Sequence, residues 1–242
     1  MPPPWPPSQG DGPALLVLPD AAAVAAAAAD LLVDALGRAL VQRGRAVLAL
    51  SGGRTPLRMY RLLADARLDW PRVHVVQVDE RFVPEEDPDR NWRAIQSELV
   101  APTGAVGHPM PVRRPPREEW AVTYAALLGT LCDGVVDACH LGLGADGHTA
   151  SLVPGDPVVD RDDVDVALTG PYEGRRRMTM TAPLLNRSGR LVWQVVGGSK
   201  RDALCQLHNG HGKAPAQRIR RQPEVWLVAD TAAARMEDDT HD

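Results

Sequence analysis

Residues 45–66, "RAVLALSGGRTPLRMYRLLADA", place an apolar run, a glycine turn and a helix-forming segment one after another. The run at 45–50 has the length of a buried strand, and the small residues at 51–53 mark a turn. Thr55 stands at an N-cap position and Pro56 at the first helical position, which both favour a helix that begins here. The stretch therefore predicts a strand, a turn and a helix in direct succession.

The same unit recurs along the chain. Strands are expected at 14–19, 45–50, 72–81, 134–144, 175–183 (an edge or mixed strand), 190–198 and 224–230. Helices are expected from Asp20, as N-cap, to 43, and at 56–66, 91–100, 117–132, 199–208 and 231–236, whereas 101–116 and 154–174 have irregular patterns. Six or seven strands that alternate with helices predict an α/β fold with a largely parallel sheet covered on both faces.

The length and composition set limits on the domain organisation. With 242 residues and 44% hydrophobic residues, the chain is long enough for one large domain, expected at 14–235, although two small domains also fit this length. The proline-rich segment 1–13 and the acidic segment 236–242 are expected to be disordered tails, because neither can bury enough apolar surface to offset its ordering.

Charge and cysteine content narrow the class of protein. A net charge of −4 provides no general field that would attract nucleic acid or an anionic membrane, so local basic groups must hold any anionic ligand. Cys132, Cys139 and Cys205 are odd in number and lack CxxC spacing, which argues against a disulfide framework and a zinc site. No signal peptide or membrane span is recognisable, so a reduced cytoplasmic protein is expected.

Polar or glycine-rich clusters follow four of the expected strands, at 51–56, 78–84, 142–151 and 197–200. Ligands of open parallel sheets bind beyond the carboxyl ends of the strands. The sequence therefore predicts one binding site formed by the four clusters.

The first cluster contains Ser51, Gly52, Gly53 and Thr55. Bare backbone N–H groups beside a helix N-terminus suit a phosphate group. The alternative is a tight turn that uses glycine only for positive φ angles.

The second cluster contains Asp79, Glu80 and Arg81. Neighbouring residues of a strand face opposite ways, so only one of the two carboxylates is expected to face the site. A solvated ion pair in a loop remains the alternative.

The third cluster, "GLGADGHTAS", contains Gly144, Asp146 and His148. An imidazole ordinarily titrates near neutral pH, which suits proton transfer. Asp146 is expected either to orient His148 or only to cap the turn, in which case His148 would merely satisfy a backbone carbonyl.

The fourth cluster places Lys200 in the first turn of a helix, where the helix dipole disfavours a cation unless an anion lies nearby. In the run at 175–177, alternation sends Arg176 to the face opposite Arg175 and Arg177. Arg177 is therefore a candidate phosphate contact, with a solvated surface as the alternative.

Several other classes of site are disfavoured. His140, His148, His208 and His211 do not have metal-ligand spacing, and HExxH is absent, so no metal site is expected. The chain also lacks the GxSxG elbow of serine hydrolases and the GxGxxG fingerprint of dinucleotide-binding proteins.

Five segments, taken in order over about residues 45–205, resemble the motif series of the 6-phosphogluconolactonases. They are "ALSGGRTP", "VDERFVPEEDPDRN", "GLGADGHTASLVPG", "RMTMTAPLLN" and "VVGGSKRDAL". That family is similar in fold to glucosamine-6-phosphate deaminases and ribose-5-phosphate isomerases. The resemblance implies a three-layer α/β/α domain of modified Rossmann type without metal or nucleotide cofactor. It also implies hydrolysis of 6-phospho-D-glucono-1,5-lactone in the oxidative pentose phosphate pathway. The protein is expected to be a monomer or weak homodimer.

The resemblance further implies the roles of single residues. His148 corresponds to the acid/base, Asp79 to an active-site carboxylate, and Arg81 and Lys200 to the cations that hold the phosphate. The remaining candidate contacts to the substrate or its phosphate are Ser51, Gly52, Gly53, Thr55, Asn91, Gly144, Asp146 and Arg177.

Three positions depart from related sequences. Arg90 stands where the family often has serine, and Gln217 where a small hydroxyl residue is common. Val153 stands where the deaminases carry a glutamate that partners the histidine, which favours hydrolysis. The alternatives are a sugar-phosphate isomerase or deaminase of the same fold and a non-catalytic sugar-phosphate sensor, although no DNA-binding segment is recognisable.

Overall fold

The computed structural model describes residues 13–112, 115–219 and 224–235. Its central sheet has seven strands in the order β1-β10-β9-β6-β2-β3-β5, and every neighbouring pair is parallel. The strands are β1 (Ala14–Leu18), β2 (Ala46–Leu50), β3 (Val73–Gln77), β5 (Val106–His108), β6 (Ala138–Gly142), β9 (Arg190–Val195) and β10 (Val225–Asp230). The predicted α/β fold with a largely parallel sheet is confirmed.

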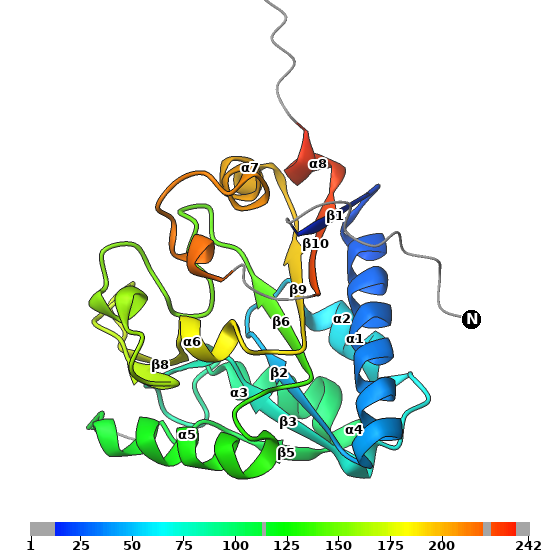
Figure 1. Ribbon diagram of the computed structural model, residues 1–242, viewed down its shortest axis with the longest axis vertical. Coiled ribbons are helices and arrows are strands. Elements are labelled where there is room, and N and C mark those ends of the chain that lie inside the picture. The colour runs from blue at the N-terminus through cyan, green and yellow to red at the C-terminus, as the bar shows by residue number, and fades with distance from the viewer. Residues whose placement is uncertain (1–12, 113–114, 220–223, 236–242) are drawn as a thin grey trace, which may run out of the picture.

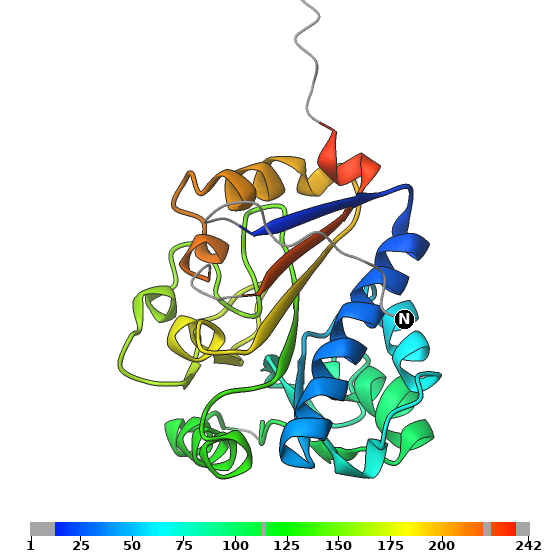
Figure 2. The same cartoon turned by 45° about the vertical axis from the view of Figure 1, so that its right-hand side comes forward.

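Helices cover both faces of this sheet (Figures 1 and 2). One face packs against α1 (Ala21–Arg43), α2 (Leu57–Ala64) and a helical segment made of α3 (Asn91–Ile95), a π-helical turn (Gln96–Val100) and α4 (Ala101–Thr103). The other face packs against α5 (Glu118–Cys132), α6 (Ala182–Leu185), α7 (Arg201–Asn209) and α8 (Thr231–Ala234).

The strand β2 shows why the sheet needs both layers. All five of its residues are buried, with Leu48 in the core on the α1 side and Ala49 in the core on the α5 side. A strand covered on both faces has a continuous apolar sequence instead of alternation, as the run at 45–50 has.

A second, antiparallel sheet of three strands lies on the α5 side, in the order β4-β8-β7. Its strands are β4 (Asp79–Arg81), β7 (Val166–Leu168) and β8 (Arg177–Met180). Met178 and Met180 of β8 belong to the same core cluster as Tyr124 of α5 and Ala49 of β2. One hydrophobic core therefore joins the small sheet to the large one.

The single strand expected at 72–81 is wrong, because the chain passes from one sheet to the other at Val78. The N–H of Val78 donates to the carbonyl of Leu50 at 2.9 Å, and its carbonyl accepts from the N–H of Met180 at 2.8 Å. Val78 thus joins both sheets, and β3 and β4 are separate strands.

Three further expectations need correction. The segment 101–116 is not all loop, since it extends the third helix to Thr103 and contains β5, and 154–174 contains β7. Both strands have only three residues, too few for a period. The strand expected at 175–183 is the middle strand of the small sheet, where it is antiparallel to both neighbours.

The helix starts agree with the sequence to within two residues. Oδ1 of Asp20 accepts from the N–H groups of Ala22 at 2.8 Å and Ala23 at 2.9 Å, which confirms the predicted cap of α1. The helix α2 begins at Leu57, with Pro56 at the N-cap position and no side-chain cap, so the role predicted for Thr55 is wrong.

The tails expected at 1–13 and 236–242 lie outside the described residues except for Pro13. In the part of the chain that is described, no helix has the length and apolar character needed to cross a membrane.

Candidate active site

Hydrogen bonds and close contacts connect the loop after β2 to residues far along the chain. Nε2 of Gln194 in β9 donates to the carbonyl of Thr55 at 3.4 Å, and Oγ of Ser51 donates to the carbonyl of His140 at 3.1 Å. A Cβ on Gly52 would lie 1.9 Å from Oδ1 of Asn91. The loop therefore has a fixed place at the carboxyl edge of the large sheet.

The two glycines of this loop meet different requirements. Gly53 has φ of +101°, a conformation that side chains strongly disfavour. Gly52 has no room for a side chain, because Asn91 lies against it. The turn thus needs both glycines, and their backbone N–H groups lie beside the start of α2.

Asp79 begins β4 and is only 5% exposed. Its Oδ2 accepts from Oγ of Ser151 at 2.5 Å, while Nδ2 of Asn91 lies 3.4 Å from its Oδ1 and donates to its backbone carbonyl at 3.1 Å. Asp79 therefore joins the loop after β6 to the start of α3.

The side chain of Glu80 is fully buried and accepts hydrogen bonds from donor groups different from those of the Asp79 carboxylate. Its carboxylate accepts from Nε2 of Gln77 at 2.8 Å, from the N–H of Asn91 at 2.9 Å and from the N–H of Trp92 at 2.8 Å, so it caps α3. Burial raises the pKa of Glu80, and these hydrogen bonds oppose that rise. Neither carboxylate forms the solvated ion pair considered above, because both are buried.

Arg81 and Arg177 are direct partners across the β4–β8 pair. Nη1 of Arg81 donates to the carbonyl of Asp89 at 2.6 Å, and Nη2 of Arg177 lies 3.3 Å from Oε2 of Glu173. Opposite residues of antiparallel strands share a face and repel one another when their charges are alike. Arg177 is 5% exposed, so the alternative of a solvated surface is wrong for it.

His148 forms a close pair with Asp146 on the loop after β6. Nδ1 of His148 lies 2.6 Å from Oδ1 of Asp146, and the same oxygen accepts from the N–H of His148 at 3.2 Å. Asp146 therefore contacts both the imidazole and the backbone of the turn, a geometry that suits an orienting residue as well as a cap. Burial disfavours its ionised form, but the hydrogen bonds from His148 outweigh this effect and lower the pKa of Asp146.

The side chain of His148 leaves room only for glycine at position 144. A Cβ on Gly144 would lie 2.1 Å from Nδ1 of His148, and the N–H of Gly144 donates to the carbonyl of His148 at 2.8 Å. Because a carboxylate faces Nδ1, this nitrogen carries the proton of the neutral ring, and Nε2 has the free lone pair. No hydrogen bond joins Nε2 to any of the described residues, so it is available to a substrate or a water molecule.

Lys200 ends a 3₁₀ turn (Gly198–Lys200) that is separated from β9 by two residues, and α7 begins at Arg201. It thus stands at the N-cap position of α7 instead of in its first turn. Its ammonium has no hydrogen bond or ion pair with the part of the chain described, so nothing there neutralises its charge.

Two residues of this region escaped the sequence reasoning. Ser151 lies within the quoted glycine-rich motif but contacts Asp79 across the fold. Tyr172 donates its hydroxyl to Oδ2 of Asp146 at 3.2 Å, and its ring centroid lies 5.5 Å from that of His148. Tyr172 falls in the irregular segment 154–174, where no periodicity indicated a contact.

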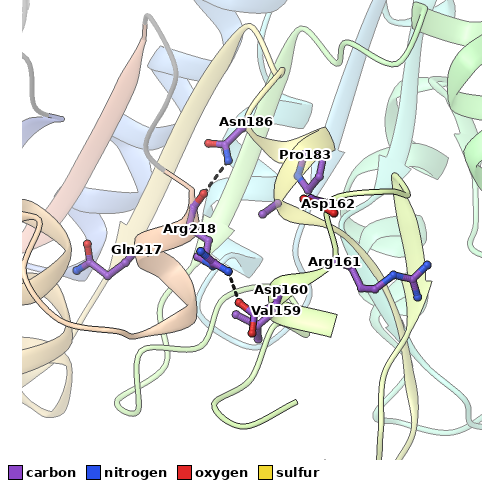
Figure 3. A pocket seen from close by; sticks show the side chains of 9 residues that line it. Val159, Asp160, Arg161, Asp162, Pro183, Asn186, Gln217 and Arg218 are labelled. Carbon is purple, nitrogen blue, oxygen red and sulfur yellow. Dashed lines mark hydrogen bonds and ion pairs between the residues drawn. The ribbon is translucent and has the colours of Figure 1, made fainter. Parts of the chain in front are cut away.

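The cavities elsewhere in the structure do not include these side chains. One cavity, of about 550 Å³, is lined by Arg161, Asn186, Arg218 and their neighbours, whose side chains Figure 3 shows. Arg218 is paired there with Asp160, and Arg161 with Asp163. The lining of this cavity includes neither the His148–Asp146 pair nor the facing Arg81 and Arg177, so we place the candidate active site at His148. Within the described residues, no group of three or more acidic, histidine or cysteine side chains is arranged to hold a metal.

Comparisons with known proteins agree with the motif series. A family model described as glucosamine-6-phosphate isomerases/6-phosphogluconolactonase matches residues 19–227. A 6-phosphogluconolactonase of Synechocystis sp. is 36% identical over 215 residues, covering 82% of this chain and 88% of the relative. One of Mycobacterium tuberculosis is 33% identical, covering 91% of this chain and 97% of the relative.

Solved structures show the same fold. The 6-phosphogluconolactonase of Thermotoga maritima superposes with a TM-score of 0.80 at 26% identity, over 89% of this chain and 99% of that chain. A monomeric glucosamine-6-phosphate deaminase gives the same TM-score of 0.80 at 20% identity. The family predicted from the motifs is thus confirmed, and the chain belongs to the glucosamine-6-phosphate isomerase/6-phosphogluconolactonase family.

Proposed function

We propose that this protein hydrolyses 6-phospho-D-glucono-1,5-lactone to 6-phospho-D-gluconate, as a step of the oxidative pentose phosphate pathway. The observation that carries the proposal is the His148–Asp146 pair, which leaves Nε2 as a proton acceptor. His148 and Arg177 contact the same ring, that of Tyr172, so the proton acceptor and a phosphate-binding cation share one site.

In the proposed reaction, Nε2 of His148 removes a proton from a water molecule whose oxygen attacks C1 of the lactone. The carbonyl oxygen becomes the oxyanion of a tetrahedral intermediate. When the intermediate collapses, the bond between C1 and the ring oxygen breaks, and Nε2 returns the proton to that oxygen. Asp146 stabilises the imidazolium that exists between the two transfers. Proton transfer by one group of this kind accounts for roughly 10²- to 10⁴-fold of the rate.

Binding of the remote phosphate would orient the reacting carbon. Arg81, Arg177 and Lys200 supply cations, and the N–H groups of Gly52 and Gly53 supply donors at the start of α2. A substrate anchored at its phosphate loses less freedom when C1 reaches His148, which lowers the barrier. These contacts should therefore affect KM, and His148 should affect kcat.

Asp79 is proposed to bond a sugar hydroxyl or to orient the attacking water. Ser151 and Asn91 hold its carboxylate in place, and these two bonds leave lone pairs on both oxygens. Ser51 and Thr55 are proposed to hold the loop in shape. The hydroxyl of Ser51 donates a hydrogen bond to β6, and the carbonyl of Thr55 accepts one from β9.

A deaminase or isomerase is the second candidate, because the fold is shared with a glucosamine-6-phosphate deaminase. Val153 stands where the resemblance places the glutamate of the deaminases, and it is 5% exposed and apolar. Proton relay through this position is therefore unavailable, which favours hydrolysis.

The test is a coupled assay in which a dehydrogenase generates the lactone and acid release follows its hydrolysis. We expect acid release well above the spontaneous rate and no ammonia from glucosamine 6-phosphate. Ammonia release without lactone hydrolysis contradicts the proposal, and saturable binding of the lactone without turnover would indicate a sensor. A cytoplasmic monomer or weak homodimer completes the proposal, and light scattering of the purified protein tests the assembly.

A further inference from the structure

Tyr172 touches three different groups of the candidate site. Its hydroxyl donates to Oδ2 of Asp146 at 3.2 Å, its ring lies at 59° to that of His148 with centroids 5.5 Å apart, and the guanidinium carbon of Arg177 lies 4.9 Å from its centroid. The first two groups belong to the proposed proton-transfer pair and the third to the phosphate subsite. Tyr172 is thus the side chain that connects the two.

The backbone holds Tyr172 in a tight turn that leads into β8. The N–H of Tyr172 donates to the carbonyl of Arg175 at 3.0 Å, and the N–H of Arg175 donates back at 3.1 Å. Glu173 and Gly174 between them have φ angles of +51° and +74°. This closed turn gives the ring a defined position, although it lies outside the regular strands.

We propose that Tyr172 is a positioning residue with two separable parts, a hydroxyl that fixes the Asp146–His148 pair and a ring that seats Arg177. The proposal rests on the proposed lactone hydrolysis and deepens it.

The hydroxyl of Tyr172 matters because the two carboxylate oxygens of Asp146 accept from different residues. Oδ1 takes both donors of His148, whereas Tyr172 donates to Oδ2. The Asp146 side chain is 38% exposed, so packing alone does not fix the plane of its carboxylate. Without the phenol, Oδ2 exchanges its fixed donor for mobile water, and the imidazole loses part of its alignment.

The phenol stays a donor over the working pH range. Burial, together with the neighbouring Asp146 carboxylate, raises the pKa of Tyr172 above its ordinary value. The charged groups that face the ring from its own turn and from β8 are Glu173 and Arg177, and Asp146 faces it from the loop after β6. The hydroxyl dipole points its positive end at Asp146, so its removal leaves a more negative potential at His148.

The ring has a separate task. Arg177 is buried, and its guanidinium lies over the aromatic face, where a cation is attracted to the ring. The same ring also contacts the imidazole of His148. Loss of the ring would therefore free Arg177 and change the binding of the phosphate, not only the proton transfer.

The experiment compares Tyr172→Phe with Tyr172→Ala in the lactonase assay, over a range of pH. We expect Tyr172→Phe to lower kcat about fivefold, a factor typical of one lost hydrogen bond, with KM within about twofold of wild type. The acid limb of its kcat/KM profile should move to higher pH. Tyr172→Ala should show the same change in kcat together with a rise in KM of at least about fivefold.

Glu173→Gln is the matched control, because Glu173 lies in the same turn and contacts Arg177 but not Asp146. We expect its acid limb to stay in place. A Tyr172→Phe variant with wild-type kcat and an unmoved acid limb overturns the role of the hydroxyl, and a Tyr172→Ala variant with wild-type KM overturns that of the ring. Wild-type protein without lactonase activity in the same assay refutes the proposed function instead, so the two failures are distinguishable.

Discussion

Arg81 and Arg177 are paired directly across the antiparallel strands β4 and β8, so their side chains leave the same face of the small sheet. Like charges in this position destabilise a strand pair. A dianionic phosphate between them would remove that repulsion, and this gives the arrangement a functional explanation.

Replacement of Arg81 by alanine is therefore predicted to raise KM for the lactone about 10- to 100-fold, the factor typical of a charge-assisted hydrogen bond, with kcat within about threefold. Arg161→Ala is the matched control, because Arg161 pairs with Asp163 beside the cavity of Figure 3. Steady-state kinetics at fixed ionic strength measure both. Equal KM values for wild type and Arg81→Ala would contradict a phosphate site at this strand pair.

Asp146→Asn should lower kcat about 10- to 100-fold. The amide retains the shape of the carboxylate but removes the negative charge that stabilises an imidazolium, and its NH₂ group can donate to Nδ1 and leave the proton on Nε2. The pH–rate profile and the kcat of the variant provide the measurement. If kcat stays within about twofold of wild type, Asp146 only caps the turn.

Gly52→Ala is predicted to lower both activity and stability. Its Cβ would lie 1.9 Å from Oδ1 of Asn91, so Asn91 must move away from Asp79, at a cost of about 1–3 kcal/mol of unfolding free energy. Gly129→Ala in α5 is the matched control, since nothing lies within 4 Å of its added Cβ, and it should stabilise the helix by about 0.5–1 kcal/mol. Urea denaturation of both variants checks the signs, and a Gly52→Ala variant as stable as wild type contradicts the close contact.

Stability should fall as the pH drops from about 6.5 to about 4 because of His140. Burial lowers the pKa of His140 from 6.5 to about 4, while its hydrogen bond to Gln194 opposes this shift. Between these two values the unfolded chain binds a proton that the folded chain rejects, so the proton favours unfolding, by up to about 3 kcal/mol. This loss of stability is complete only at pH values below the pKa of His140 in the folded protein.

Urea denaturation at pH 7 and pH 5 measures this effect. Other acidic groups titrate in the same range, so the comparison is with His140→Gln, which has no imidazole. We expect the wild-type protein to lose more stability than the variant between the two pH values. Parallel losses would show that His140 does not titrate in this way.

Much of the central sheet could be predicted from residues with a clear pattern. The apolar runs before Ser51 and Gly197, and the Asp20 cap, identify strands and a helix whose burial on both faces leaves a continuous signal. The separation of β3 from β4 could not be predicted, because they follow one another with only Val78 between them, and only the hydrogen bonds of Val78 to two different sheets divide the stretch.

The candidate site shows the same limit. Gly144, Asp146 and His148 lie within one short motif, so their closeness follows from the sequence. Ser151 meets Asp79 from 72 positions away, and Tyr172 meets Asp146 from 26 positions away. Such contacts depend on how the small sheet packs on the large one, which no local pattern records.

The central claim is that His148 moves the proton, and the kcat of His148→Ala tests it most directly. Hydrolysis of enzymatically generated lactone is followed at saturating substrate, and the spontaneous rate is subtracted. We predict a kcat lower by roughly 10²- to 10⁴-fold, with KM within about threefold of wild type because the phosphate contacts remain. A His148→Ala variant with the kcat of the wild-type protein would contradict the account.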